Sequence, residues 1–412
     1  MVKIRAFKAL RPPPEFVQDV ASLPYDVLNS SMARRLSENN PKSFLRVIKP
    51  EIELDSDIDP YHESVYLRGA ENLNKFMEKG WLVKDEKPSL YAYRLEMNGH
   101  IQTGLGAALS CSDYENGIIK EHEKTREIKE NDRVQHILKC KAHTGPIFLV
   151  APRARRFKEI LGRVSSNQPV YDFVSSDRIR HTLWTIQDEN TIRELTGFFA
   201  LSSQVYIADG HHRSAAAVRV CRLLQATNPS HNGEEEYNFF LGVIFPEDEM
   251  RIMEYNRAVR DLNGLSPDEF IKKVEEKFKI HEATAPLPAN PHTFGIYVEK
   301  QWKWATARQG TFNAYDPVGH LDVSILQNNI LSPILGINDP RRDKRIEFIG
   351  GIYGAGELER LVDSGKFAAA FSLYPVYLDD LLNIADARET MPPKSTWFEP
   401  KLRSGIITHL ID

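Results

Sequence analysis

The chain has 412 residues, of which 42% are hydrophobic and 27% charged, and its formal net charge is −4. This composition is typical of a folded globular protein with room for two or three domains. The acidic balance argues against a general nucleic-acid binder, which needs a basic surface. No apolar run approaches the ~20 residues of a membrane span, and the first residues lack the apolar segment of a signal peptide. Three widely spaced cysteines fit neither a disulfide framework nor a zinc ribbon. We therefore expect a cytoplasmic protein without nucleic-acid or membrane partners.

Helix and strand signals alternate along the whole chain, which predicts an α/β (α+β) fold with mixed sheets. Strands are predicted at residues 3–10, 43–48, 90–97, 102–109, 146–151, 237–245, 294–298, 303–307, 346–349 and 367–373. Helices are predicted at residues 31–39, 61–79, 266–278 and 378–387, with a further helix starting at 321. Asn98-Gly99 is a hairpin signal between two of the strands, and Pro246 is a natural hinge. We expect one domain over residues 1–245 and another over 246–412.

The most informative stretch is the junction between an apolar strand and a small-residue helix at residues 204–217. Asp209, Gly210, His211, His212 and Arg213 lie between the two elements. Backbone N–H groups at a helix N-terminus favour an anion, Arg213 suits phosphate or carboxylate, and Asp209 could hold a divalent cation. The alternative is a tight turn in which Asp209 or Ser214 caps the helix. The two histidines and the arginine together favour a phosphate-and-metal site.

A second informative stretch covers residues 118–145 and includes His122, Glu123 and Lys124. A histidine beside carboxylates is a candidate general base, because a neighbouring charge or burial can shift its pKa. The alternative is a solvated charged helix. The stretch lacks the second histidine of a metalloprotease motif.

A third stretch near the end of the chain is stiffened by two prolines. Lys394, Ser395 and Thr396 offer a charge and two hydroxyls, and Trp397 and Phe398 could stack on a base or sugar. The alternative is a rigid surface loop pinned by two buried aromatics. The prolines replace the glycines that a phosphate-binding P-loop needs, which excludes that motif.

Two other features of the sequence each allow a functional and a structural interpretation. Asp26, next to Tyr25, is a candidate for lining a site, with a simple turn residue as the alternative. The glycines at residues 350–356 lack the spacing of a dinucleotide-binding loop, and a flexible turn explains them.

Three blocks together resemble the free L-serine kinases built on the ParB/sulfiredoxin-like fold. These blocks are residues 120–123 (Lys-Glu-His-Glu), 209–213 (Asp-Gly-His-His-Arg) and 393–396 (Pro-Lys-Ser-Thr), in the order that the kinases show. More closely, nearly the whole chain resembles a widespread, functionally uncharacterised family of bacterial proteins. Its marks are residues 7–12, 24–27, 122–125, 206–213 and 391–398.

The kinase resemblance implies a ParB/sulfiredoxin-like core with large insertions and a C-terminal α/β domain that contributes a substrate loop. It implies a small-molecule kinase that uses ATP or ADP with Mg²⁺ and phosphorylates free L-serine or a related acceptor. Glu123 would be the catalytic base and Asp209 the second catalytic residue and metal ligand. Phosphate and nucleotide would contact Gly210, His211, His212, Arg213, His122 and Lys124. Substrate would contact Lys394, Ser395, Thr396 and Asp26.

The chain departs from the kinases in the interval between Glu123 and Asp209, which is longer here, and in an extra N-terminal region. The inserted material could reshape the acceptor pocket. Two other functions stay open: a nucleotide-binding regulatory switch like the ParB relatives, and a binding protein without catalysis. Glu123 favours catalysis, because a pure phosphate binder does not need it. A homodimer stays open as the oligomeric state.

Overall fold

Two strands joined by a tight turn form the middle of the larger sheet. β4 (Leu90–Met97) and β5 (His100–Ser110) pair antiparallel, with Met97 opposite His100. Asn98 and Gly99 in the turn have φ angles of 51° and 78°. A two-residue hairpin turn needs positive φ at both positions, and Asn-Gly accepts it readily. The hairpin predicted from the sequence is confirmed.

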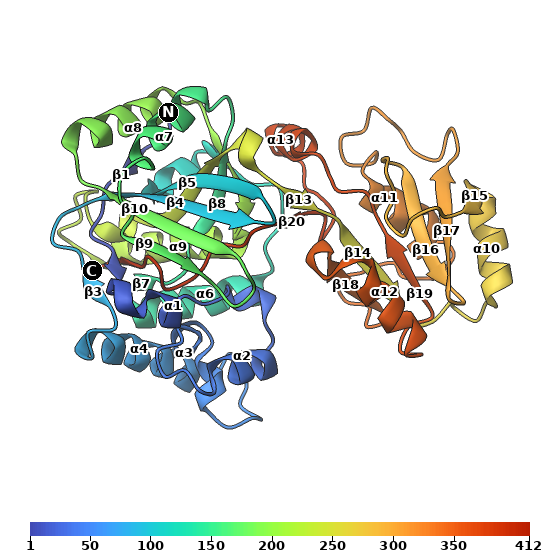
Figure 1. Cartoon of the computed structure of the whole chain (residues 1–412), viewed down its shortest axis with the longest axis horizontal. Helices are drawn as coiled ribbons and strands as arrows, with labels where there is room; N and C mark the ends of the chain where they lie inside the picture. Colours follow the sequence, from blue (N-terminus) through green and yellow to red (C-terminus); the bar gives the residue numbers. More distant parts are fainter. The chain divides into compact units, whose positions relative to one another are not determined.

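The computed structural model describes residues 1–412, and the chain divides into two units (Figure 1). Unit 1 contains residues 1–250 and 400–412, and unit 2 contains residues 251–399. This division differs from the one expected at Pro246, because the segment 400–412 returns to unit 1 after unit 2 is complete.

Unit 1 is built on a nine-stranded mixed sheet with the order β6-β11-β8-β12-β5-β4-β10-β9, and β1 pairs with β5. Its remaining strands are β1 (Ile4–Arg5), β6 (Ile119–Lys120), β8 (Ile147–Ala151), β9 (Tyr171–Val174), β10 (Arg180–Ile186), β11 (Val205–Asp209) and β12 (Phe239–Pro246). Two small sheets pair β2 (Leu10–Arg11) with β3 (Val83–Lys84), and β7 (Ala142–His143) with β21 (His409–Leu410). The pairs β6–β11 and β8–β12 are parallel and the others in the large sheet are antiparallel. The predicted mixed α/β fold class is therefore confirmed.

The helices of unit 1 contribute to two hydrophobic cores. They are α1 (Val17–Val20), α2 (Ser30–Ser37), α3 (Leu45–Ile48), α4 (Glu63–Glu78), α5 (Cys111–Glu115), α6 (Glu127–Cys140), α7 (Arg155–Val164), α8 (Glu189–Leu201) and α9 (His211–Thr227). Short 3-10 turns are η1 (Pro14–Phe16), η2 (Tyr25–Val27), η3 (Pro50–Glu53), η4 (Glu236–Asn238) and η5 (Glu247–Glu249). One core packs α7, α8 and α9 on the large sheet. The second joins α2, α3 and α4 into a helical layer that lies next to α6 (Figure 1).

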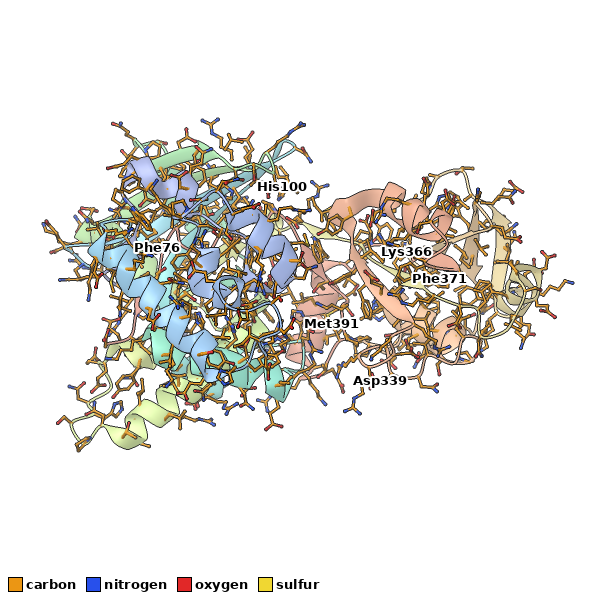
Figure 2. All side chains as sticks on the ribbon, turned by 90° about the horizontal axis from the view of Figure 1, so that it is seen from below. Phe76, His100, Asp339, Lys366, Phe371 and Met391 are labelled. Carbon is orange, nitrogen blue, oxygen red and sulfur yellow. The ribbon has the colours of Figure 1, made fainter.

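The strand predicted at residues 43–48 is wrong, because α3 occupies this position. Leu45, Val47 and Ile48 are all buried in the helical layer, where they pack with Phe76 of α4 (Figure 2). A short apolar run buried on all sides carries no periodicity, so the pattern could not separate helix from strand.

Unit 2 has a six-stranded sheet with the order β15-β17-β16-β19-β14-β18. Its strands are β14 (Tyr255–Val259), β15 (Phe278–Glu282), β16 (Thr293–Val298), β17 (Gln301–Ala307), β18 (Ile346–Gly350) and β19 (Ala369–Ser372), and β13 (Ile252–Met253) pairs separately with β20 (Trp397–Phe398). Its helices are α10 (Pro267–Glu275), α11 (Asp322–Leu326), α12 (Gly354–Asp363) and α13 (Leu378–Asp386), with turns η6 (Gln327–Leu331) and η7 (Gly351–Tyr353). Ser266 and Glu269 form a reciprocal capping box at the start of α10, as expected for a helix there. Phe371 of β19 is fully buried (Figure 2).

The three cysteines, Cys111, Cys140 and Cys221, are buried free thiols. This agrees with the expectation that they pack in the interior rather than form disulfides. None of the helices combines the length and the apolar composition that crossing a bilayer requires.

Candidate functional site

The centre of the candidate site is the junction between β11 and α9. β11 ends at Asp209, Gly210 adopts a φ of 103°, and α9 begins at His211. No side chain caps this helix, because Ser214 bonds instead to the carbonyl of His211 inside the first turn. The capping alternative for Asp209 or Ser214 is therefore wrong. The N–H groups of His211 and His212 form an uncapped helix N-terminus, where an anion is favoured.

Asp209 is flanked by two cations. Its Oδ2 lies 3.2 Å from Lys401 Nζ and 3.7 Å from Arg213 Nη2. Burial opposes ionisation of Asp209, but Lys401 and Arg213 outweigh it and hold the pKa of this carboxyl well below its usual range. Asp209 is therefore ionised at neutral pH. Lys401 ends the proline-rich stretch of residues 392–401, but the sequence predicted no role for it. The neighbouring residues give no indication that Lys401 pairs with Asp209.

Arg213 joins Asp209 to the N-terminal segment. Its Nη2 lies 3.6 Å from Asp26 Oδ2, and its Nη1 donates to the carbonyl of Pro146. Asp26 belongs to the short turn η2. Burial disfavours the charge on Arg213, but Asp26 and Asp209 outweigh that effect and raise its pKa. The structure thus brings three of the predicted residues, Asp26, Asp209 and Arg213, to one place.

The loop between β6 and α6 carries Glu123 to the start of α9. β6 runs parallel to β11, with Lys120 opposite Tyr206, so the residues that follow each strand emerge at the same edge of the sheet. Glu123 Oε2 lies 3.8 Å from His211 Nδ1. Burial lowers the pKa of His211 to about 4, so its ring is neutral at pH 7 and this contact is not an ion pair. Two segments remote in the sequence meet here.

Three histidines surround this contact, and each is held differently. His122 is buried, and its ring meets that of His211 edge-on with centroids 4.4 Å apart. Burial, and then the neighbouring His211, hold the pKa of His122 well below its usual value. Nδ1 of His122 and Nε2 of His211 are buried without a hydrogen-bond partner. His212 Nε2 accepts from the N–H of Arg126, which precedes α6.

The predicted phosphate-binding group therefore has two parts. His122 and His211 are neutral, so they can offer hydrogen bonds to a ligand but no positive charge. The positive charge at the site comes from Arg213 and Lys401. Lys124 is exposed on the same loop as Glu123.

The residues predicted to contact substrate from the third stretch belong to unit 2. Ser395 is buried and its hydroxyl donates to the carbonyl of Pro392, while the carbonyl of Lys394 accepts from Arg257. These bonds order the loop from within. A substrate role for Lys394, Ser395 and Thr396 stays a prediction.

The carboxylates at the site decide whether it could hold Mg²⁺. No group of three or more His, Cys, Asp or Glu side chains is arranged to hold a metal ion. Asp209 is a single carboxylate already paired with Lys401. Magnesium beside nucleotides is usually held by one or two carboxylates, with phosphate oxygens and water completing the shell. Oδ2 of Asp209 faces two cations, and a metal-ligand role for Asp209 stays a prediction.

Comparison with solved structures found distant similarities. A mutant of free serine kinase in complex with AMP has a TM-score of 0.36 and 12% identity, covering 73% of this chain and 92% of that one. SbnI with a C-terminal truncation, from Staphylococcus aureus, has a TM-score of 0.39 and 10% identity, covering 73% and 86%. A conserved hypothetical protein from Pyrococcus furiosus has a TM-score of 0.36 and 11% identity, covering 73% and 94%.

Comparison with functionally curated proteins found no match. Residues 4–324 match the family described as "Protein of unknown function (DUF1015)". This match covers all of the site described in unit 1 except Lys401. The chain belongs to the DUF1015 family.

Proposed function

We propose that this protein is a small-molecule kinase that transfers a phosphoryl group from ATP or ADP to the hydroxyl of free L-serine or a related small acceptor. The observation that carries the proposal is the approach of Glu123 to His211, 3.8 Å apart, at the uncapped start of α9. A carboxylate next to an anion-binding helix N-terminus is what transfer to a hydroxyl needs, and simple phosphate binding does not need it. The order of the three sequence blocks supports the same reaction.

In this proposal the phosphates of the donor lie at the N–H groups of His211 and His212. Gly210 lets the backbone approach them, because it has no Cβ. Arg213 and Lys401 neutralise charge that develops on the transferred group, which is the largest demand of phosphoryl transfer. Mg²⁺ bound with the nucleotide at Asp209 would add further positive charge to the phosphates.

Glu123 accepts the proton of the acceptor hydroxyl as its oxygen attacks the terminal phosphorus. The new bond joins that oxygen to phosphorus, the bond from phosphorus to the bridging oxygen breaks, and the shortened nucleotide leaves. Nδ1 of His211 lies next to Glu123 and can orient the carboxylate toward the acceptor. The partnerless nitrogens of His122 and His211 are hydrogen-bonding positions that a bound ligand would satisfy.

The test is incubation of the protein with ATP or ADP, Mg²⁺ and a panel of amino acids, followed by mass spectrometry of the products. Glu123→Gln and Asp209→Asn should each abolish transfer, and circular dichroism should show an intact fold. Glu127→Gln serves as the matched control, because Glu127 is exposed on the first turn of α6. Normal turnover by both site variants would refute the assigned roles. Nucleotide binding without any phosphorylated product would favour a regulatory switch instead.

A further inference from the structure

A cavity in unit 1 lies directly beside Arg213. Together with the open solvent at its mouth, it holds about 470 Å³ of space. Its polar lining comprises Tyr25, Arg133, His136, His143, Thr144, Arg213 and Ser404. The remaining walls come from residues 24 and 48, α6, the segment around β7 and β8, and β12. Much of this lining comes from the N-terminal region and α6.

Arg133 of α6 is buried against this cavity with one donor group left over. Its Nε and Nη2 bond to Asp132 Oδ2 at 2.9 and 2.8 Å, and its guanidinium carbon lies 4.0 Å from the ring centroid of Tyr25. The aromatic face and the carboxylate fix the plane of the guanidinium. The contacts to Asp132 use Nε and Nη2, so Nη1 is the terminal nitrogen that they leave out. A fixed, charged donor at a pocket wall is suited to a carboxylate.

Arg213 lines the cavity and also belongs to the candidate site. A Cβ at Gly210 would lie 3.1 Å from its guanidinium carbon, and a Cβ at Gly145 would lie 3.8 Å from its Nη1. The side chain therefore extends from the start of α9 to the cavity wall at Gly145. Its Nε is buried without a partner. A ligand in the cavity would touch the same arginine that faces Asp209.

The charges around the cavity favour a carboxylate group over a doubly charged phosphate. Asp132 already balances Arg133, and Asp26 and Asp209 lie near Arg213. The two histidines of the lining are neutral at pH 7, because burial lowers the pKa of His136 to about 4 and that of His143 to about 3. A doubly charged phosphate would lack matching positive charge here. A carboxylate can bind Nη1 of Arg133, and the apolar wall accepts a short carbon chain.

We infer that this cavity is the acceptor pocket, in which Nη1 of Arg133 binds the carboxylate of a small hydroxy amino acid while Arg213 guides its hydroxyl toward Glu123. The inference rests on the proposed kinase function for the transfer step. Recognition of the carboxylate by Arg133 is separate from it and is tested separately.

The test uses the double variant Asp132→Asn/Arg133→Met, which removes the donor without leaving Asp132 as an unpaired buried charge. The matched control is Glu115→Gln/Arg222→Met, which removes an exposed ion pair between α5 and α9. L-serine is compared with ethanolamine, which keeps the hydroxyl and amine but lacks the carboxylate. Binding is measured by calorimetry with ADP present, and transfer by KM and kcat.

We expect the wild type and the control to prefer L-serine over ethanolamine. The Arg133 variant should raise the KM for L-serine roughly ten- to a hundredfold, which is the loss expected for one charged hydrogen bond. Its KM for the nucleotide should stay unchanged, and its preference over ethanolamine should disappear. An unchanged preference for L-serine in an active variant would overturn the pocket and leave the kinase in place. The alternative outcome is that L-serine binds, that the Arg133 variant weakens this binding, and that no acceptor is phosphorylated. This result would overturn the proposed kinase function and support the proposed pocket.

Discussion

Lys401 Nζ lies 3.2 Å from Asp209 Oδ2, although the whole of unit 2 separates the two residues in the chain. Lys401 is buried, and a buried ammonium needs a partner. Each residue therefore stabilises the charged form of the other. Under the proposed function, this lysine would exchange part of its contact with Asp209 for a phosphate oxygen of the bound nucleotide.

Replacing Lys401 should reduce phosphoryl transfer more than it reduces folding. We expect Lys401→Met to lower kcat by roughly 10²- to 10³-fold, as removal of one electrostatic donor typically does. Steady-state assays of product formation measure this, with Lys366→Met as the control because Lys366 is exposed in unit 2 (Figure 2). Asp209→Asn/Lys401→Met should recover stability that the single variant loses, and it should remain inactive. Full activity of Lys401→Met would exclude a role in transfer.

Gly210 should tolerate no side chain. Alanine there must adopt a φ of 103°, and its Cβ would lie 3.1 Å from Cζ and Nε of Arg213. We expect Gly210→Ala to cost about 1–3 kcal/mol in the free energy of unfolding and to displace Arg213. Urea denaturation and nucleotide binding measure the two effects.

The comparison for that variant is Gly162→Ala in α7, where an added Cβ meets nothing within 4 Å. A helical Gly→Ala change should stabilise the protein by about 0.5–1 kcal/mol. Equal effects of the two substitutions would mean that Gly210 has no special conformational role.

Stability of unit 1 should fall when the pH drops below about 6.5. Burial, with Arg403 as the next cause, lowers the pKa of His181 to about 3, so the folded protein excludes a proton that the unfolded chain binds below pH 6.5. Between pH 6.5 and 3 this histidine should lower the free energy of unfolding by about 1.4 kcal/mol for each unit that the pH falls. His136 and His143 act in the same direction, whereas burial raises the pKa of Asp322 in unit 2 to about 7, which acts in the opposite direction.

The effect of His181 is isolated by comparing the wild type with His181→Gln in urea denaturation from pH 7.5 to 5. The slope of the unfolding free energy against pH should correspond to nearly one proton fewer taken up on unfolding in the variant than in the wild type. His281→Gln, a change of a less buried histidine on β15, is the matched control for the substitution itself. A slope that is the same for the wild type and His181→Gln would show that His181 titrates normally.

The sequence predicted those parts of the fold that local patterns control. The Asn98-Gly99 hairpin, the Ser266 capping box and the strand-to-helix junction at Gly210 depend on backbone conformations that few residue types adopt, so they could be recognised locally. Short buried segments could not be assigned: residues 45–48, inside the predicted strand, form the helix α3 because only tertiary packing decides their conformation.

The same distinction between local and tertiary determinants holds for the candidate site. The sequence predicted Asp209, Gly210 and Arg213 because they adjoin in one motif. It could not predict that Lys401 would pair with Asp209, or that Arg133 and Tyr25 would line a cavity beside Arg213. Those contacts join segments that are far apart in the chain. The residues involved carry no local signal for their partners.

The return of residues 400–412 to unit 1 has a consequence for biosynthesis. During translation the ribosome must complete all of unit 2 before it adds Lys401 and the buried residues that follow it. A chain that terminates early would carry Asp209 and Arg213 but not the second cation, and it would leave the partner of β7 missing. Under the proposed function, phosphoryl transfer would then reach its full rate only in chains that extend through Lys401.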